Sequence, residues 1–180
     1  ELKGMERHRG SLFRAMGEQP SQKDFEGALA FALAGLDASR PVVVEAESSK
    51  IGNCRLPPEI WKAMVAAPRV AIAAPRPARA EYLARAYADL TSDAGRLAAT
   101  VGLLRPAHPA EVIEEWLGLA SAGEFAALAD GLMERHYDPR YGKHRDRMAV
   151  PFTEVAAPDL RPEALPVIAA QVAEAVKRLV

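Results

Sequence analysis

The fold is restricted most by two short apolar runs that alternate with helical patterns. Val42–Val44 and Val70–Ala73 are continuous, and polar residues or prolines follow each of them. Continuous runs of this kind are typical of strands buried on both faces, as in parallel sheets. Apolar residues at helical spacing precede, separate and follow the two runs. This alternation predicts an α/β protein with a parallel sheet, whose strands lie at residues 42–46, 70–74 and 152–156.

Helical repeats fill most of the remaining chain. Ser21 followed by Asp24 has the form of a capping box, which predicts that a helix begins there. The segment between the second and third strands is helical and ends in a basic stretch. We therefore expect residues 91–149 to form a helical insertion or subdomain, and residues 1–90 with 150–180 to form the α/β domain. Helices are expected near residues 21–39, 93–105, 109–120, 123–136 and 162–179, and after Pro57 and Pro77.

Charge and cysteine content exclude several classes of protein. The chain has 180 residues, with 23 Lys and Arg against 24 Asp and Glu, so nucleic-acid binding requires local basic patches. One cysteine excludes a disulfide framework and a cysteine-based zinc site, and Cys54 fits a reducing, cytoplasmic compartment. His8 and His144 lack the spacing of metal ligands, so we expect no metal site. No apolar stretch approaches the ~20 residues of a membrane span, and we expect no membrane partner.

The polar loop after the first apolar run is the first candidate site. Glu45, Glu47, Ser48 and Lys50 lie where a buried strand would end, and ligands of open α/β sheets bind beyond the carboxyl ends of strands. A carboxylate in this place can hold a metal-bound water beside a nucleotide, and a hydroxyl and an ammonium group can contact an anion. A solvated polar loop explains the same residues, so both interpretations stay open.

A second candidate site is a short basic segment near the start of the chain. Arg7 and Arg9 flank His8, and Gly10 and Ser11 follow. Arginine offers a planar fork of donors, and glycine lets backbone N–H groups approach an anion. Arg9 and Ser11 are therefore candidate phosphate ligands, with a solvated basic loop as the alternative.

The third candidate is a basic segment interleaved with tyrosines, at residues 135–147. Five lysines and arginines face two aspartates in these thirteen residues. Bases stack on aromatic rings while cations meet the phosphate backbone, so the segment is a candidate RNA surface. The alternative is a charged helix end, where cations complement the helix dipole. The candidate RNA-binding residues are Arg135, Tyr137, Asp138, Arg140, Tyr141, Lys143 and Arg145.

Two arginines after the second apolar run give a weaker signal. Arg76 and Arg79 follow prolines and would either reach over a phosphate site or begin a solvated helix. The chain contains no G-x-x-x-x-G-K-[ST] phosphate loop and no G-x-S-x-G nucleophile motif. No catalytic residue is assigned for this reason.

Several motifs follow one another in an order that is characteristic of one protein family. They are His8–Ser11, Gln19–Glu26 and Val44–Gly52, continued by Leu56-Pro57, Trp61, Met64 and Tyr137–Tyr141. Together they resemble the C-terminal, P-loop-type domain of the tRNA 2-selenouridine synthase family. The likeness covers most of residues 1–145, and the number and order of the motifs make it specific.

The resemblance implies a fold, a reaction and a set of residues. The family has a rhodanese-like domain with a catalytic cysteine, followed by a P-loop domain. Its members replace the sulfur of wobble 2-thiouridine in tRNA with selenium, through an S-geranylated intermediate. The reaction uses geranyl diphosphate and selenophosphate. Whether a nucleotide with Mg²⁺ also binds is an open question. By motif match, ligand- or tRNA-binding roles fall on Arg9, Ser11, Glu45, Glu47, Ser48, Lys50, Tyr137, Asp138 and Tyr141.

The departures from the family pattern also carry expectations. The phosphate loop and the rhodanese cysteine are missing from this sequence. We therefore expect a P-loop NTPase-like sheet that is incomplete at its N-terminus. We also expect the chain to be a piece of a longer protein and not to catalyse selenation alone. In P-loop folds the strand before the phosphate loop lies between the strands expected at 42–46 and 70–74. The expected partners are tRNA and the rhodanese-like domain. A small-molecule kinase relative and a non-catalytic helical interaction module built on 91–136 remain alternatives.

Overall fold

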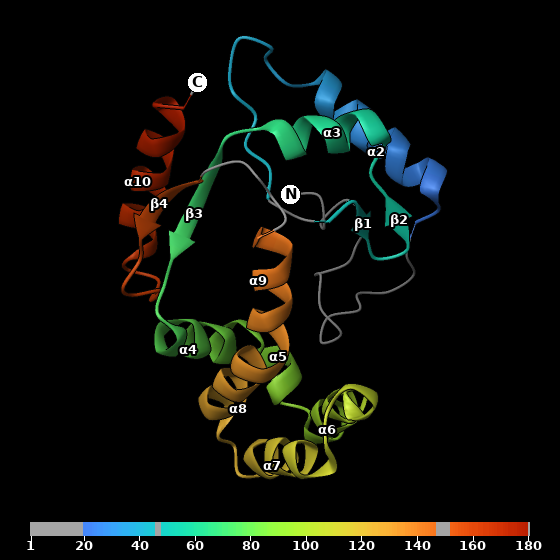
Figure 1. The fold of residues 1–180 in the computed structure, drawn as a ribbon, viewed down its shortest axis with the longest axis vertical. Helices are drawn as coiled ribbons and strands as arrows, with labels where there is room; N and C mark the ends of the chain where they lie inside the picture. The colour runs from blue at the N-terminus through green and yellow to red at the C-terminus, as the bar shows by residue number, and fades with distance from the viewer. Residues whose placement is uncertain (1–19, 46–47, 147–151, 180) are drawn as a thin grey trace. The chain divides into compact units, whose positions relative to one another are not determined.

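Two separately packed units divide the chain. The computed structural model describes residues 20–45, 48–146 and 152–179, without the side chains of 143–146 (Figure 1). Unit 1 comprises Glu1–Ala67 and unit 2 comprises Pro68–Val180. The boundary expected at residue 91 from the sequence lies inside unit 2.

Unit 1 begins with helix α2 (Gln22–Ala34), which starts at the predicted capping box. The Ser21 hydroxyl oxygen accepts a hydrogen bond from the Asp24 backbone N–H at 3.2 Å, which satisfies one of the free donors of the first turn. The helix ends before Gly35, whose N–H donates to the Phe31 carbonyl. It is thus shorter than the predicted 21–39 helix.

A small antiparallel hairpin follows in unit 1, and the sequence analysis did not predict it. Strand β1 (Lys50–Ile51) pairs with β2 (Cys54–Arg55), and Gly52 in the turn has a φ of 56°, a conformation that glycine adopts without strain. The Gln22 side chain donates to the Arg55 carbonyl and accepts from the Arg55 N–H, both at 2.8 Å. These two hydrogen bonds fasten the start of α2 to the hairpin.

The core of unit 1 lies between α2, the hairpin and helix α3 (Pro58–Ala66), which begins at a proline pair as expected. Proline is well tolerated in a first helical turn, where its missing N–H would have no partner. The buried residues are Phe25, Leu29, Ile51, Cys54 and Leu56, with Ile60, Trp61 and Met64 packed against them. The lone cysteine is therefore part of an apolar core.

The strand expected at residues 42–46 is a wrong prediction over its described part. Val42, Val43 and Val44 are exposed, Val43 by 68%, and residues 42–45 have no regular secondary structure. A strand requires a neighbour that takes up its backbone N–H and C=O groups. No described segment pairs with this run, so its apolar, β-branched character is not enough to make it a strand.

The sheet of unit 2 consists, among the described residues, of two parallel strands. Strand β3 (Arg69–Ala73) pairs with β4 (Phe152–Ala156) in a register that runs from Arg69 opposite Phe152 to Ala73 opposite Ala156. Helix α10 (Leu165–Lys177) follows β4 and contacts both strands, as Figure 1 shows. The predicted α/β class and the strands expected near 70–74 and at 152–156 are confirmed.

Helices connect β3 to β4. They are α4 (Arg76–Ala86), α5 (Ala88–Thr91), α6 (Ala94–Gly102), the 3-10 turn η1 (Arg105–Ala107), α7 (Ala110–Ser121), α8 (Phe125–Leu132), the π-helix η2 (Met133–Tyr137) and α9 (Asp138–Asp146). Helix α8 contacts α4 and α7, and α7 contacts α6. Their buried residues include Leu97, Val101, Ile113, Trp116, Leu128 and Leu132, which lie in the helices expected near 93–105, 109–120 and 123–136.

The π-helix η2 has a cause in the sequence. Pro139 is the second residue of α9, and a proline inside a helix lacks the N–H that would bond the preceding turn and crowds the carbonyl four residues before it. The Asp138 N–H instead donates to the Met133 carbonyl, five residues back. This wider turn joins α8 to α9 without a break, and such turns are frequent at functional sites.

Candidate nucleic-acid interface

The basic segment predicted to bind RNA begins in η2 and continues through α9. Its first arginine pairs across the helices: Arg135 Nη1 and Nη2 donate to the two carboxylate oxygens of Glu115 on α7, at 2.7 and 2.9 Å. The Glu115 carboxylate raises the pKa of Arg135. This fork-to-carboxylate pair directs the Arg135 charge toward α7.

A second group of ion pairs joins α4 to the same segment. Arg79 makes two parallel hydrogen bonds to the Asp138 carboxylate, at 2.9 and 2.8 Å. Arg76 pairs with Asp130 at 2.7 Å and with Glu134 at 2.9 Å. The alternatives weighed for Arg76 and Arg79, a phosphate contact or a solvated helix start, did not include this structural role.

Replacing Asp138 with asparagine is expected to lower the free energy of unfolding of unit 2 by about 1–2 kcal/mol. A hydrogen bond to a charged group contributes about 1.5–3 kcal/mol, and partial exposure of the pair reduces this. Urea unfolding at pH 7 measures the effect. Asp159→Asn, which removes a pair with the largely exposed Arg161, is the matched control and should change stability far less than Asp138→Asn does; equal effects of the two variants would contradict the role of Asp138.

The two tyrosines of the segment have different environments. Tyr137 is largely buried, and this burial raises the pKa of its hydroxyl well above the usual range. Tyr141 on α9 is 59% exposed. Lys143 and Arg145 follow it in the same helix. Of the two tyrosine rings in the segment, that of Tyr141 is therefore the one open to solvent.

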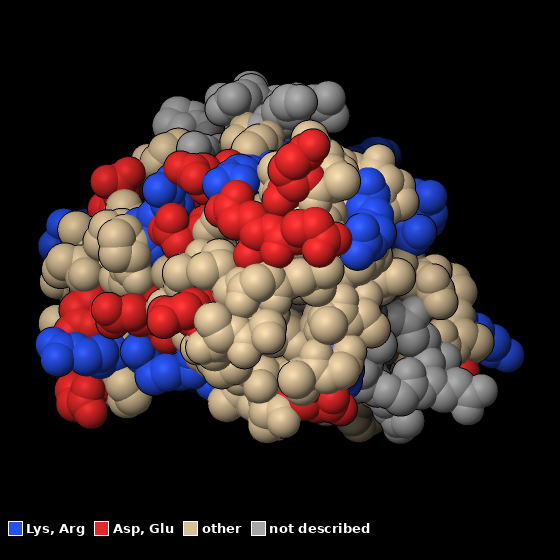
Figure 2. Space-filling model, turned by 90° about the horizontal axis from the view of Figure 1, so that it is seen from below, with Lys and Arg blue, Asp and Glu red and all other residues tan. Residues whose placement is uncertain are grey.

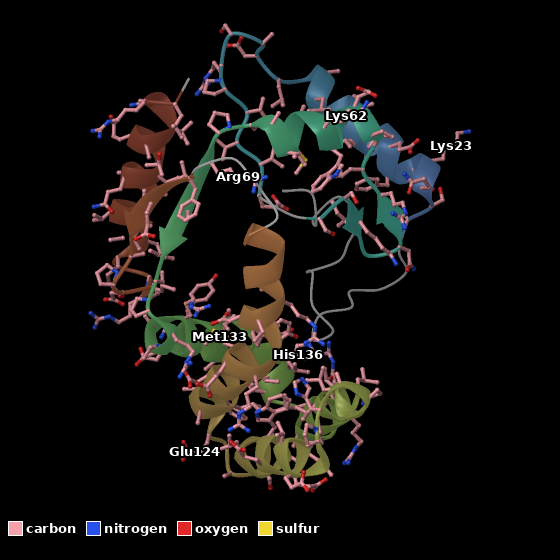
Figure 3. All side chains as sticks on the ribbon, viewed as in Figure 1. Lys23, Lys62, Arg69, Glu124, Met133 and His136 are labelled. Atoms are coloured by element: carbon pink, nitrogen blue, oxygen red, sulfur yellow. The ribbon has the colours of Figure 1, made fainter. Side chains whose placement is uncertain are left out.

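Two histidines without a role assigned from the sequence meet at this segment, and Figure 3 labels one of them, His136. His108 Nε2 lies 2.8 Å from His136 Nδ1, and Arg140 Nη1 contacts the same Nδ1 and donates to the His136 carbonyl at 3.0 Å. Burial, then the charges of Arg140 and His108, lowers the pKa of His136 to about 4. Burial and the charges of Arg140 and Arg135 also lower the pKa of His108.

The candidate anion-binding loop lies in unit 1 and is only partly described. The Ser48 hydroxyl accepts from the Lys50 N–H at 3.2 Å and donates to the Lys50 carbonyl, so it stabilises its own turn. Glu45 is half-buried, and Lys50 is exposed at the start of β1. The other three predicted ligands, Arg9, Ser11 and Glu47, lie outside the described residues, so the ligand site remains a prediction.

The face of the molecule drawn in Figure 2 carries both signs of charge. Figure 2 shows acidic and basic side chains side by side rather than one continuous basic face. In the described ranges no three His, Cys, Asp or Glu side chains are grouped so that they could hold a metal ion. No helix among the described residues has the length and apolar character that crossing a bilayer requires.

Comparisons with known proteins agree on one family. Residues 1–102 match the family model described as the tRNA 2-selenouridine synthase AAA domain. A tRNA 2-selenouridine synthase of Hahella chejuensis is 32% identical over 83% of this chain and 47% of its own length. That of Bordetella bronchiseptica is 30% identical over 83% of this chain and 48% of its own, and that of Chromohalobacter salexigens is 41% identical over 49% and 24%. No solved structure matches the chain.

The matches extend over much of the chain but over less of the relatives. The chain spans about half the length of the two relatives that match most of it. The family model alone covers more than half of the 180 residues. The resemblance that the ordered motifs indicated is thereby confirmed: the chain belongs to the tRNA 2-selenouridine synthase family.

Proposed function

We propose that this chain is the tRNA-binding part of an enzyme that replaces sulfur with selenium in wobble 2-thiouridine. The reaction would pass through an S-geranylated intermediate, with selenophosphate as the selenium donor. Family membership supports the reaction class, since the relatives are named tRNA 2-selenouridine synthases. The rhodanese-like domain expected from the family would supply the catalytic cysteine, because Cys54 is buried in the core of unit 1.

The observation that carries the tRNA-binding proposal is the exposure of Tyr141 on a cationic helix. Lys143 and Arg145 follow Tyr141 in α9, and Arg145 comes four residues after it, a spacing that places residues on one side of a helix. An exposed ring offers a stacking surface for an unpaired base, while the cations attract the phosphates beside it. Wobble positions lie in a single-stranded loop, which suits this mode of recognition.

A second part of the proposal concerns a pyrophosphate-bearing ligand such as geranyl diphosphate. We propose that Glu45, Glu47, Ser48 and Lys50 bind it on a P-loop-type fold, together with the basic segment containing Arg9 and Ser11. The support is the order of motifs shared with the family. A nucleotide with Mg²⁺ would use the same acidic and cationic groups.

The alternative of a non-catalytic helical interaction module has less support. Such a module on residues 91–136 would present a contiguous apolar patch to its partner. Among the large hydrophobic residues of this range that the structure describes, only Leu103 is exposed, by 62%. Single exposed hydrophobic residues are ordinary on protein surfaces.

Binding to a labelled tRNA transcript, followed by fluorescence anisotropy over a range of salt concentrations, tests the proposal. Affinity should fall with rising salt, because cations that meet phosphates release counterions. Lys143→Ala and Arg145→Ala should each weaken binding about 3- to 10-fold and reduce the salt slope by about 1. Tyr141→Ala should weaken it about 5-fold or more through lost stacking.

Lys177→Ala is the matched control for the loss of one positive charge. Lys177 lies on α10 and pairs with Glu174, far along the chain from α9. Its replacement should change affinity by less than about 2-fold. A wild-type chain that fails to bind tRNA, or three α9 variants that bind as the control does, would refute the proposal.

A further inference from the structure

The cluster of His108, His136 and Arg140 draws on three separate elements. His108 lies between η1 and α7, His136 in η2 and Arg140 in α9. The ring of Trp116 on α7 meets the edge of His108, with ring centroids 4.9 Å apart. His136 is 7% exposed, whereas Arg140 is an exposed residue. The cluster thus connects a buried imidazole to a guanidinium at the surface.

The contacts determine which nitrogen of His136 carries the proton. An arginine side chain is always protonated in proteins, so Arg140 Nη1 can only donate. His136 Nδ1 must therefore accept, and its ring proton lies on Nε2. His108 Nε2 lies 2.8 Å from the same nitrogen and also presents a proton, so the two donors share the single lone pair of Nδ1. His136 is therefore neutral in this arrangement, and the lowering of its pKa to about 4 agrees with this.

Arg140 differs from the neighbouring arginines in its hydrogen-bond partners. Arg76, Arg79 and Arg135 each pair with a carboxylate. Arg140, within the described part of the chain, is held by a neutral imidazole nitrogen and a backbone carbonyl. Its positive charge is not neutralised by these groups, and it lies next in sequence to the exposed Tyr141. A guanidinium oriented in this way is suited to a phosphate oxygen.

From this juxtaposition we infer that His136 is a positioning residue: its Nδ1 orients the Arg140 guanidinium to bind a backbone phosphate of the nucleic acid, and the N–H of His108, directed at the same Nδ1, favours the same tautomer. This inference rests on the proposed tRNA-binding function and deepens it. It adds two histidines, 28 residues apart in sequence, to a surface that the sequence defined by its arginines, lysines and tyrosines alone.

Two substitutions at position 136 separate orientation from folding. His136→Leu removes the acceptor and should weaken binding of the full chain to a labelled tRNA transcript about 5-fold. His136→Asn keeps an oxygen near the place of Nδ1 and should bind within about 2-fold of wild type. Arg140→Ala should weaken binding about 5- to 10-fold, and adding His136→Leu to it should cause no further loss, because the two residues act through one contact.

Other results would overturn the inference. If His136→Leu weakens binding equally with and without Arg140, or not at all, His136 does not act through the guanidinium. If the wild-type chain does not bind tRNA, the proposed function fails and this inference with it; wild-type binding that is insensitive to His136 leaves the function intact and overturns the inference alone.

An NMR measurement on the wild-type chain does not depend on the folding of any variant. With ¹⁵N-labelled histidine at pH 7, the Nδ1 signal of His136 should have the shift of an unprotonated nitrogen. Addition of the tRNA transcript should move this signal in the wild type and leave it in place in Arg140→Ala. A protonated Nδ1, or an unmoved signal in a wild-type chain that binds the tRNA, would contradict the positioning role.

Discussion

Replacing Trp116 with alanine is expected to lower the free energy of unfolding of unit 2 by about 3–5 kcal/mol, the range for large aromatic residues in cores. Trp116 is 0% exposed on α7 and contacts the edge of His108. Gly131 on α8 packs against it so closely that a Cβ at that position would lie 2.8 Å from the indole Nε1. The alanine variant leaves a cavity where the indole was. Because Gly131 has no side chain to fill it, the cavity can close only if α7 moves toward α8.

Urea unfolding followed by circular dichroism measures this loss, and hydrogen exchange assigns it to a unit. Trp61→Ala is the matched control, because Trp61 is only partly buried and lies in unit 1. It should leave the exchange rates of α7 and α8 unchanged. Trp116→Phe should be milder than Trp116→Ala, since the indole N–H is buried without a hydrogen-bond partner among the described residues. A Trp116→Ala loss below about 1 kcal/mol would mean that α7 does not pack as described.

The helices could be predicted because their signal is local. Apolar residues at helical spacing mark the buried side of a helix wherever it packs, and Leu97, Ile113 and Leu128 are buried within helices expected from that spacing. The strand at 152–156 was predicted at its observed bounds. Val42–Val44 have the same local signal as a strand but lack a described neighbour, and pairing is a property of two segments that one segment cannot reveal.

The roles of charged residues were harder to predict than the helices. A basic run looks the same in sequence whether its side chains meet RNA, solvent or the rest of the protein. In unit 2, Arg135 and Asp138 are engaged by Glu115 and Arg79, which are 20 and 59 residues distant. These partners come together only when α4 and α7 pack beside η2 and α9. The partners of Tyr141 remain a prediction, because its exposure is compatible with RNA and with water.

The His136 environment also predicts how stability depends on pH. The pKa of His136 is lowered from 6.5 to about 4 by burial and by the charges of Arg140 and His108. Below pH 6.5 the unfolded chain therefore binds a proton that the folded chain does not, and acid favours unfolding. The stabilisation is complete above pH 6.5 and is lost as the pH falls toward 4. Since one pKa unit corresponds to about 1.4 kcal/mol, we expect His136 to remove about 2–3 kcal/mol between pH 7.5 and 4.5.

The comparison of wild type with His136→Asn isolates this contribution. Carboxylates with lowered pKa, such as Asp159 and Glu174, also weaken the fold in acid, but they do so equally in both chains. Urea unfolding at pH 7.5, 6.0 and 4.5 should give a smaller loss of stability for the variant than for the wild type. The lowered pKa of His108 acts in the same direction and keeps some pH dependence in the variant. Parallel curves of stability against pH for the two proteins would contradict this prediction. They would mean that protonation of His136 costs the folded protein nothing, and that the contact with Arg140 does not keep the imidazole neutral.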